Sequence, residues 1–232
     1  VWNGFRLSQT TADAFSIRKR THADRPWIGT FSGTRAPGYV FAGDVSGGLG
    51  VALKDFWQSY PTALQVDNAA ARNARLTVWM WSPDAEPMDL RHYDNVAHDL
   101  EASYEDVQEG MSTPYGVART HTLTLVPSVA YGGKETVART AVMLAEDAPL
   151  LCTPEYLHAK HAFGVWSLPD RSNLKRARVE DRLKDYLDYY VKAVDQHRWY
   201  GFWNYGDVMH AYDPVRHTWR YDIGGFAWDN TE

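Results

Sequence analysis

Up to about residue 150, apolar and polar positions follow short alternating runs of the kind that predict β-strands. Turn-forming residues separate the runs, for example Gly47-Gly48 and Gly132-Gly133. The predicted strands are rich in Val, Thr and aromatic residues and occupy 15–21, 39–44, 50–60, 74–81 and 119–129. Because no helical pattern intervenes, we expect this part of the chain to be an antiparallel β-sandwich.

Beyond residue 150 the apolar positions recur every three to four residues, which predicts an amphipathic helix from about Asn173 to His197. Ser172 or Asn173 can supply the side-chain oxygen that caps its N-terminus. The residues that define its apolar stripe are Val179, Leu183, Leu187, Val191 and Val194.

The stretch 147–154 separates the two patterns and contains two prolines, so we place the domain boundary within it. Residues 1–150 are predicted to form the sandwich domain, and residues 151–232 the beginning of a helical domain. A single amphipathic helix cannot bury its apolar face alone. We therefore expect the chain to be a portion of a longer protein.

The composition narrows the possible partners. A formal charge of −5 makes a nucleic-acid partner unexpected, and no apolar run reaches the roughly 20 residues that span a membrane. Cys152 is the single cysteine, so an internal disulfide and a Cys-based zinc site are excluded, and we expect a buried thiol. The 10 Trp and 14 Tyr residues fit either sugar stacking or a large β-sheet core.

Residues 202–232 combine aromatic rings with many ionisable groups. Such mixtures are costly to bury unless they are paired, and they occur disproportionately at functional sites. The polar members are Tyr205, Asp207, His210, Tyr212, Asp213, Arg216, His217, Arg220, Tyr221 and Asp222. We interpret this run as part of a site; a structural cap with mutually paired Asp and Arg side chains is the alternative.

One reaction that such a set suits is β-elimination from a uronic acid. This reaction needs a cation for the C6 carboxylate, a base for the C5 proton and an acid for the O4 leaving group. Arg suits the first role, and His or Tyr suit the other two. Hydrolysis of a glycosidic bond would instead need two carboxyl groups on opposite sides of the bond. The candidates for that are Asp207, Asp213, Asp222, Asp229 and Glu232, and sequence spacing does not decide between the two reactions.

Two other places carry candidate chemistry. A predicted loop after residue 81 holds Asp89, Arg91, His92, Tyr93 and Asp94. Lys54, Asp55 and Trp57 could face a groove, with a solvated strand face around a buried Trp as the alternative.

A metal site has weak support. His158 and His161 are three residues apart and His210 and His217 are seven apart, but neither pair belongs to an HExxH motif. We expect no metal or other cofactor, with a structural divalent cation as the alternative.

Four longer stretches carry a family resemblance. They are "GVALKDFWQSYP", "LTVWMWSPDAEPMDLRHYD", "STPYGVART" and "WYGFWNYGDVMHAYDPVRHTWRYDIGGFAWDNTE", in this order along the chain. Together they resemble the YetA-like, exo-acting rhamnogalacturonan lyase family. Members of that family are similar in having a small β-barrel, a central β-sandwich and a C-terminal α/α toroid. The resemblance implies that this chain holds the sandwich and the opening of the toroid.

The resemblance also implies elimination at a galacturonate of the rhamnogalacturonan backbone of pectin, from a chain end. The catalytic candidates placed on the matching motifs are His210 as the base, Arg220 as the cation and Tyr205 or Tyr221 as the acid. The predicted substrate-binding residues are Arg91, His92, Trp203, Asn204, Asp207, Arg216 and Trp219. Because the cleft of such an enzyme lies between sandwich and toroid, we expect these 232 residues alone to be inactive.

Two other functions stay open at this point. A non-catalytic carbohydrate-binding module would use the aromatic rings without cleaving, and a glycoside hydrolase would act on uronate-containing glycans through the carboxylates. The expected partner in each case is an oligosaccharide or polysaccharide. The size of pectin favours a secreted or periplasmic protein, and cytoplasmic processing of imported oligosaccharides is the alternative.

Overall fold

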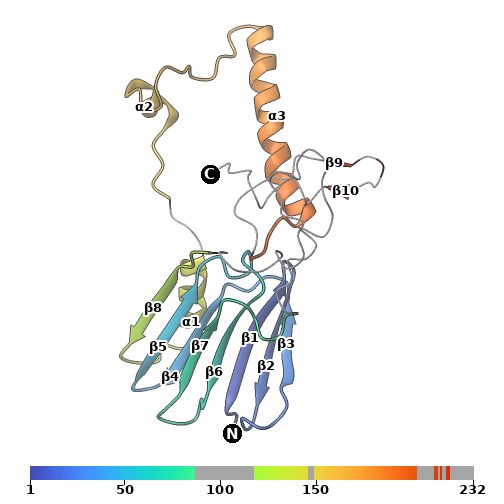
Figure 1. The fold of residues 1–232 in the computed structure, drawn as a ribbon. Coiled ribbons are helices and arrows are strands. Elements are labelled where there is room, and N and C mark those ends of the chain that lie inside the picture. The colour runs from blue at the N-terminus through green and yellow to red at the C-terminus, as the bar shows by residue number, and fades with distance from the viewer. Residues whose placement is uncertain (87–117, 146–148, 203–211, 214, 216–217, 220–232) are drawn as a thin grey trace. The chain divides into compact units, whose positions relative to one another are not determined.

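A computed structural model describes residues 1–86, 118–145, 149–202, 212–213, 215 and 218–219 (Figure 1). The chain divides into two compact units. The first comprises Val1–Glu146 together with Tyr200–Glu232, and the second comprises Asp147–Trp199.

Five strands of the first unit form an antiparallel sheet in the order β3-β2-β1-β6-β7 (Figure 1). They are β1 (Gly4–Thr11), β2 (Ala14–Arg20), β3 (Ile28–Gly33), β6 (Thr62–Asp67) and β7 (Arg75–Trp79). Leu7 of β1 lies opposite both Ile17 of β2 and Leu64 of β6. Because directly opposed residues point to the same side of a sheet, this register gathers apolar side chains on one face.

A second antiparallel sheet has the order β4-β5-β8. Its strands are β4 (Tyr39–Asp44), β5 (Gly47–Leu53) and β8 (Leu123–Ser128). Two short strands, β9 (Tyr212–Asp213) and β10 (Thr218–Trp219), pair with each other.

The core of the first unit lies between the two larger sheets. Leu64 of β6 is 1% exposed, and it belongs to one buried cluster with Leu53 at the end of β5 and with Phe56 just beyond it. Val40 of β4 and Val78 of β7 pack against this cluster. Apolar side chains of both sheets therefore meet in one core, which confirms the predicted β-sandwich.

The pattern of strands departs from the prediction in two ways. Strands β1, β3 and β6 were not predicted, and the run expected to be a strand over 50–60 ends at Leu53. Strand β6 is buried at every position but its last, including the polar Thr62 and Gln65, so it has no apolar and polar alternation to recognise. After Leu53 the chain turns, and Asp55 adopts a positive φ of 52° that ends regular strand geometry.

The expectation that no helix precedes residue 150 is wrong. Helix α1 (Lys134–Ala145) follows β8 and packs against β4 and β5 (Figure 1). Its sequence, KETVARTAVMLA, is rich in Ala and in other good helix formers, and Gly132-Gly133 directly precedes it. Its Ala141 is buried.

The second unit contains α2 (Pro154–Ala159) and α3 (Leu174–His197). Asn173 caps α3, because its Oδ1 accepts hydrogen bonds from the backbone N–H groups of Lys175 (3.0 Å) and Arg176 (3.1 Å). The predicted helix and one of its two predicted caps are thus confirmed. Among the described residues no helix is long and apolar enough to cross a bilayer.

Cys152 lies in the extended segment just before α2 and is exposed, so the expectation of a buried thiol is wrong. Its neighbours Leu150 and Leu151 are exposed as well, because this segment makes no helix or strand that would place side chains against a core.

Candidate functional site

Most residues predicted from the sequence to form the site lie outside the described part of the chain. This holds for the catalytic candidates His210, Tyr205, Arg220 and Tyr221, and for the substrate-binding candidates Arg91, His92, Trp203, Asn204, Asp207 and Arg216. Trp219 ends strand β10, where its backbone pairs with Tyr212 of β9. The roles given to all these residues stay predictions.

The start of the terminal run, residues 200–202, is described and belongs to the sandwich unit. The backbone N–H of Gly201 donates to the carbonyl of Gln58 (2.7 Å), and that of Phe202 donates to the carbonyl of Tyr60 (2.6 Å). Gln58 and Tyr60 lie on the turn that connects β5 to β6. The chain therefore rejoins the sandwich immediately before the segment that holds the catalytic candidates.

Gly201 suits this attachment because of its backbone geometry. Its φ of +129° is a conformation that L side chains rarely adopt, and a Cβ at this position would lie 3.2 Å from the Tyr60 ring. Glycine therefore permits the close approach of the two segments.

Arg119 is a second attachment point for the same segment. Its Nη1 donates to the carbonyls of Gly201 (3.1 Å) and Phe202, and its Nη2 donates to the Ser59 hydroxyl (3.1 Å). Ser59 is buried. Since charged donors form the stronger hydrogen bonds, Arg119 fixes the position of the chain at residue 202.

Aromatic rings gather around this attachment. The Phe202 and Trp81 rings meet edge to face with centroids 5.3 Å apart, and the His121 ring lies 6.0 Å from Phe202. The indole N–H of Trp81 donates to the Glu86 carbonyl (3.0 Å), which fixes the ring.

A second pair of rings joins the same turn, which carries Trp57, to Tyr200 of the returning segment. Trp57 and Tyr200 meet edge to face with centroids 4.8 Å apart, and the Arg35 guanidinium lies 4.1 Å above the Trp57 ring. Arg35 also forms an ion pair with Asp13 (3.1 Å). We call Trp57, Trp81, Tyr200 and Phe202 the aromatic edge.

Lys54, Asp55 and Trp57 do not lie on a strand as the sequence suggested; they belong to the turn after β5. Trp57 is half-buried and not fully covered, so the alternative of a strand face around a buried Trp is wrong. Its ring instead contributes to the aromatic edge.

His121 is the titratable base at this edge. Burial lowers the pKa of His121 below its usual 6.5, and the positive charge of Arg119 lowers it further. The imidazole is therefore neutral at pH 7, the form that accepts a proton. The sequence interpretation missed both residues. Arg119 and His121 are two positions apart just before β8, and this spacing alone does not distinguish a site in the sequence.

A different polar cluster lies on β1 and β2. Asp84 accepts hydrogen bonds from the Ser8 hydroxyl (2.6 Å), from Arg6 Nη1 (2.9 Å) and from Arg18 Nη1 (3.2 Å). Asp84 follows β7, in the part of the predicted loop cluster that the structure describes. Because these side chains are hydrogen-bonded to one another, we interpret the cluster as a structural tie.

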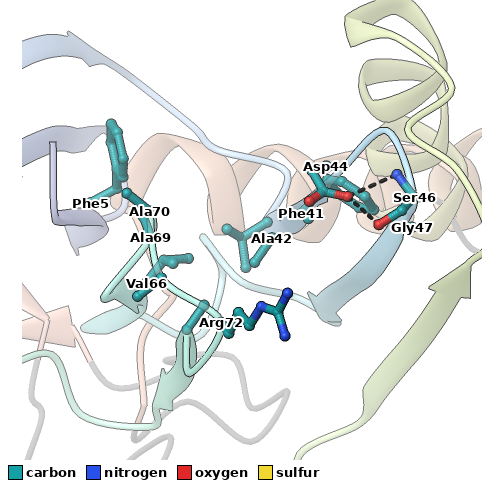
Figure 2. A pocket seen from close by; sticks show the side chains of 14 residues that line it. Phe5, Phe41, Ala42, Asp44, Ser46, Gly47, Val66, Ala69, Ala70 and Arg72 are labelled. Carbon is teal, nitrogen blue, oxygen red and sulfur yellow. Dashed lines mark hydrogen bonds between the residues drawn. The ribbon is translucent and has the colours of Figure 1, made fainter. Parts of the chain in front are cut away.

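A hollow of about 870 Å³ lies near the β4–β5 turn (Figure 2). Phe5, Phe41 and Val66 contribute apolar surface, and Asp44 lies at the turn (Figure 2). Hydrogen bonds from the Ser46 hydroxyl and backbone to Asp44 lower the pKa of this carboxyl. The wall includes the Arg72 cation and the Asp44 carboxylate, and its described lining contains no His or Tyr. The hollow lies beside the first residues of β5, whereas Trp57 of the aromatic edge comes after the last residue of that strand.

No group of three or more metal-ligating side chains occurs among the described residues. His158 and His161, the closer of the two histidine pairs in sequence, have ring centroids 6.5 Å apart.

Comparison with known proteins defines the class of this chain. Residues 1–142 match the model of the PcRGLX-like protein central beta sandwich domain, and residues 147–232 match that of the PcRGLX-like protein C-terminal alpha/alpha toroid domain. The chain belongs to this family, and the predicted family and fold class are confirmed.

A curated relative agrees with this assignment. The chain is 40% identical over 232 residues to "Uncharacterized protein YetA" of Bacillus subtilis (strain 168). The match covers 100% of this chain and 27% of that relative.

Proposed function

We propose that the complete protein is a polysaccharide lyase that cleaves rhamnogalacturonan oligosaccharides by β-elimination at galacturonate, from a chain end. The match to PcRGLX-like domains supports this, since it relates the chain to rhamnogalacturonan lyases. The product would carry a C4–C5 double bond in the uronate.

The observation that best supports a sugar substrate is the aromatic edge. Flat aromatic rings present apolar faces to bound groups. Phe202, whose ring contacts that of Trp81, lies directly before the segment that carries His210 and Arg220. The hydrogen bonds of Gly201 and Arg119 hold the beginning of that segment beside these rings. A rigid attachment favours catalysis, because catalytic groups must stay within about 0.5 Å of their productive positions.

The test is a time course of the complete protein with rhamnogalacturonan oligosaccharides. We expect the ultraviolet absorbance of the unsaturated uronate to rise and mass spectrometry to identify unsaturated products. Products that gain the mass of water would instead identify a hydrolase, and saturable binding without cleavage would identify a binding module. Homogalacturonan oligosaccharides serve as the control for backbone specificity.

Metal removal provides a second arm of the same test. We propose that protein side chains neutralise the galacturonate carboxylate, so that chelation with EDTA leaves the rate unchanged. A rate that falls with EDTA and returns with a divalent cation would contradict this part of the proposal.

A further inference from the structure

We propose that His121 is a catalytic residue of this elimination: its imidazole takes the C5 proton of a galacturonate bound against Trp81 and Phe202. The inference rests on the proposed function. It assigns the base to a described residue of the sandwich, whereas the sequence assigned it to His210.

The first argument is the direction of the side chain. Leu123 of β8 lies opposite Leu53 of β5, and the backbone N–H of Lys54 donates to the Thr122 carbonyl (3.0 Å), which extends the pairing beyond β8. Side chains two positions apart in an extended chain point to the same side. His121 and Arg119 both reach Phe202: the two rings lie 6.0 Å apart, and Arg119 donates to the Phe202 carbonyl.

The second argument is that the His121 ring is partly exposed and lies beside two aromatic rings. His121 is half-buried, as are Trp81 and Phe202. The three rings form part of one surface, with His121 6.0 Å and Trp81 5.3 Å from Phe202. A sugar ring stacked on such a surface would bring its C–H groups near the imidazole.

The third argument is that Arg119 and His121 differ in their hydrogen bonds. Arg119 donates to the carbonyls of Gly201 and Phe202 and to the Ser59 hydroxyl, which makes it a positioning residue. His121 has no hydrogen bond to another side chain or backbone group among the described residues, so its ring nitrogens are not committed there.

The protonation state agrees with this role. Burial and the nearby charge of Arg119, which is on the same segment, keep the imidazole neutral at pH 7. Phe202, the described ring that contacts His121 from the returning segment, carries no charge. The uncharged imidazole has the lone pair that a base requires.

The atoms balance as follows. The imidazole nitrogen gains the C5 proton, the electron pair of the C5–H bond forms the C4–C5 double bond, and the C4–O4 bond breaks. The departing O4 takes a proton from a water molecule. The imidazolium then gives its proton to the hydroxide that this leaves, which restores the neutral imidazole and the water.

The experiment compares His121→Gln with His22→Gln in the complete protein. His22 is exposed on the connection between β2 and β3, so its replacement changes a histidine away from the aromatic edge. We expect His121→Gln to lower kcat for unsaturated product by about 10²–10⁴-fold, with KM changed by less than about 3-fold, and His22→Gln to leave both unchanged. Circular dichroism melting shows whether each variant is folded.

The outcomes separate the two proposals. If the unaltered protein forms unsaturated product and His121→Gln matches His22→Gln, the role of His121 is overturned while the lyase function stands. If the unaltered protein forms no unsaturated product, both are overturned. Should His121→Gln fail to fold, the pH profile of the unaltered protein decides. A kcat that falls as the pH drops through a pKa below 6.5 supports the proposal, and a flat acid limb overturns it.

Discussion

Leu64 of the sandwich is 1% exposed, whereas Leu187 of α3 is 64% exposed. The apolar stripe of α3 was predicted from its periodicity, whereas β6 and its Leu64 were not. The sandwich nevertheless supplies an opposing sheet for Leu64, while the described part of the helical unit leaves Leu187 uncovered. Leu183 and Val191 of the same stripe are exposed in the same way. An α/α toroid buries such faces between neighbouring helices. A periodic pattern thus indicates that a helix forms, but it does not indicate which surface covers it.

The largest expected effect tests burial directly. Leu64→Ala should lower the free energy of unfolding of the 232-residue chain by about 2–5 kcal/mol, because it leaves a cavity between the sheets. Leu187→Ala is the matched control and should change it by no more than about 0.5 kcal/mol. Chemical denaturation followed by tryptophan fluorescence and by circular dichroism measures both. Equal losses would mean that the α3 stripe is covered after all.

A smaller effect concerns how α3 begins. Asn173→Ala should destabilise the helix by about 1 kcal/mol, because the N–H groups of Lys175 and Arg176 lose their shared acceptor. Lys175→Ala keeps the backbone donors and serves as the control. Helical circular dichroism during thermal melting is the measurement. An unchanged melting curve for Asn173→Ala would show that solvent replaces the cap without loss.

The smallest effect depends on pH. Hydrogen bonds from Ser172, followed by that from Arg176, lower the pKa of Asp170 from 3.8 to about 2. The folded-state pKa is therefore depressed, and the stabilisation is present above about pH 4 and is lost as the pH falls towards 2. Asp170→Asn should melt earlier than the unaltered chain at pH 5, and this gap should narrow as the pH falls towards 2. Asp185→Asn controls for the change in net charge, and a gap for Asp170→Asn that is as large at pH 2 as at pH 5 would contradict the assignment.

Several strands and the long helix could be predicted from residue patterns. The elements that were not predicted were missed for physical reasons. Strand β4 agrees with its predicted range of 39–44, and α3 follows its cap at Asn173, because local periodicity and capping act within a few residues. Strand β6 escaped notice because its buried Thr62 and Gln65 are satisfied by partners that are not visible in a linear pattern. The Thr62 hydroxyl, for example, donates to the Phe56 carbonyl (2.8 Å).

The candidate site, like the fold, could be predicted only in part from the sequence. The many aromatic and ionisable residues of 202–232 identified this run as a candidate site. They did not indicate which residues hold the beginning of the run in place. Arg119 and Gly201 are 82 residues apart in sequence, and only the folded chain brings them within 3.1 Å. His121 was missed because a lone histidine before a strand has no distinctive spacing, and its pKa shift arises from burial and from Arg119.

The bonds that Arg119 makes to residues 201 and 202 also have a consequence for the order of folding. During synthesis at about 5–20 residues per second, the ribosome needs several seconds to add the 82 residues that separate Arg119 from Gly201. Until then the Ser59 and Arg119 side chains have no Gly201 or Phe202 carbonyl to complete their network. The nascent sandwich therefore lacks the hydrogen bonds from Arg119 to residues 201 and 202. These bonds can form only after the helical unit has been synthesised.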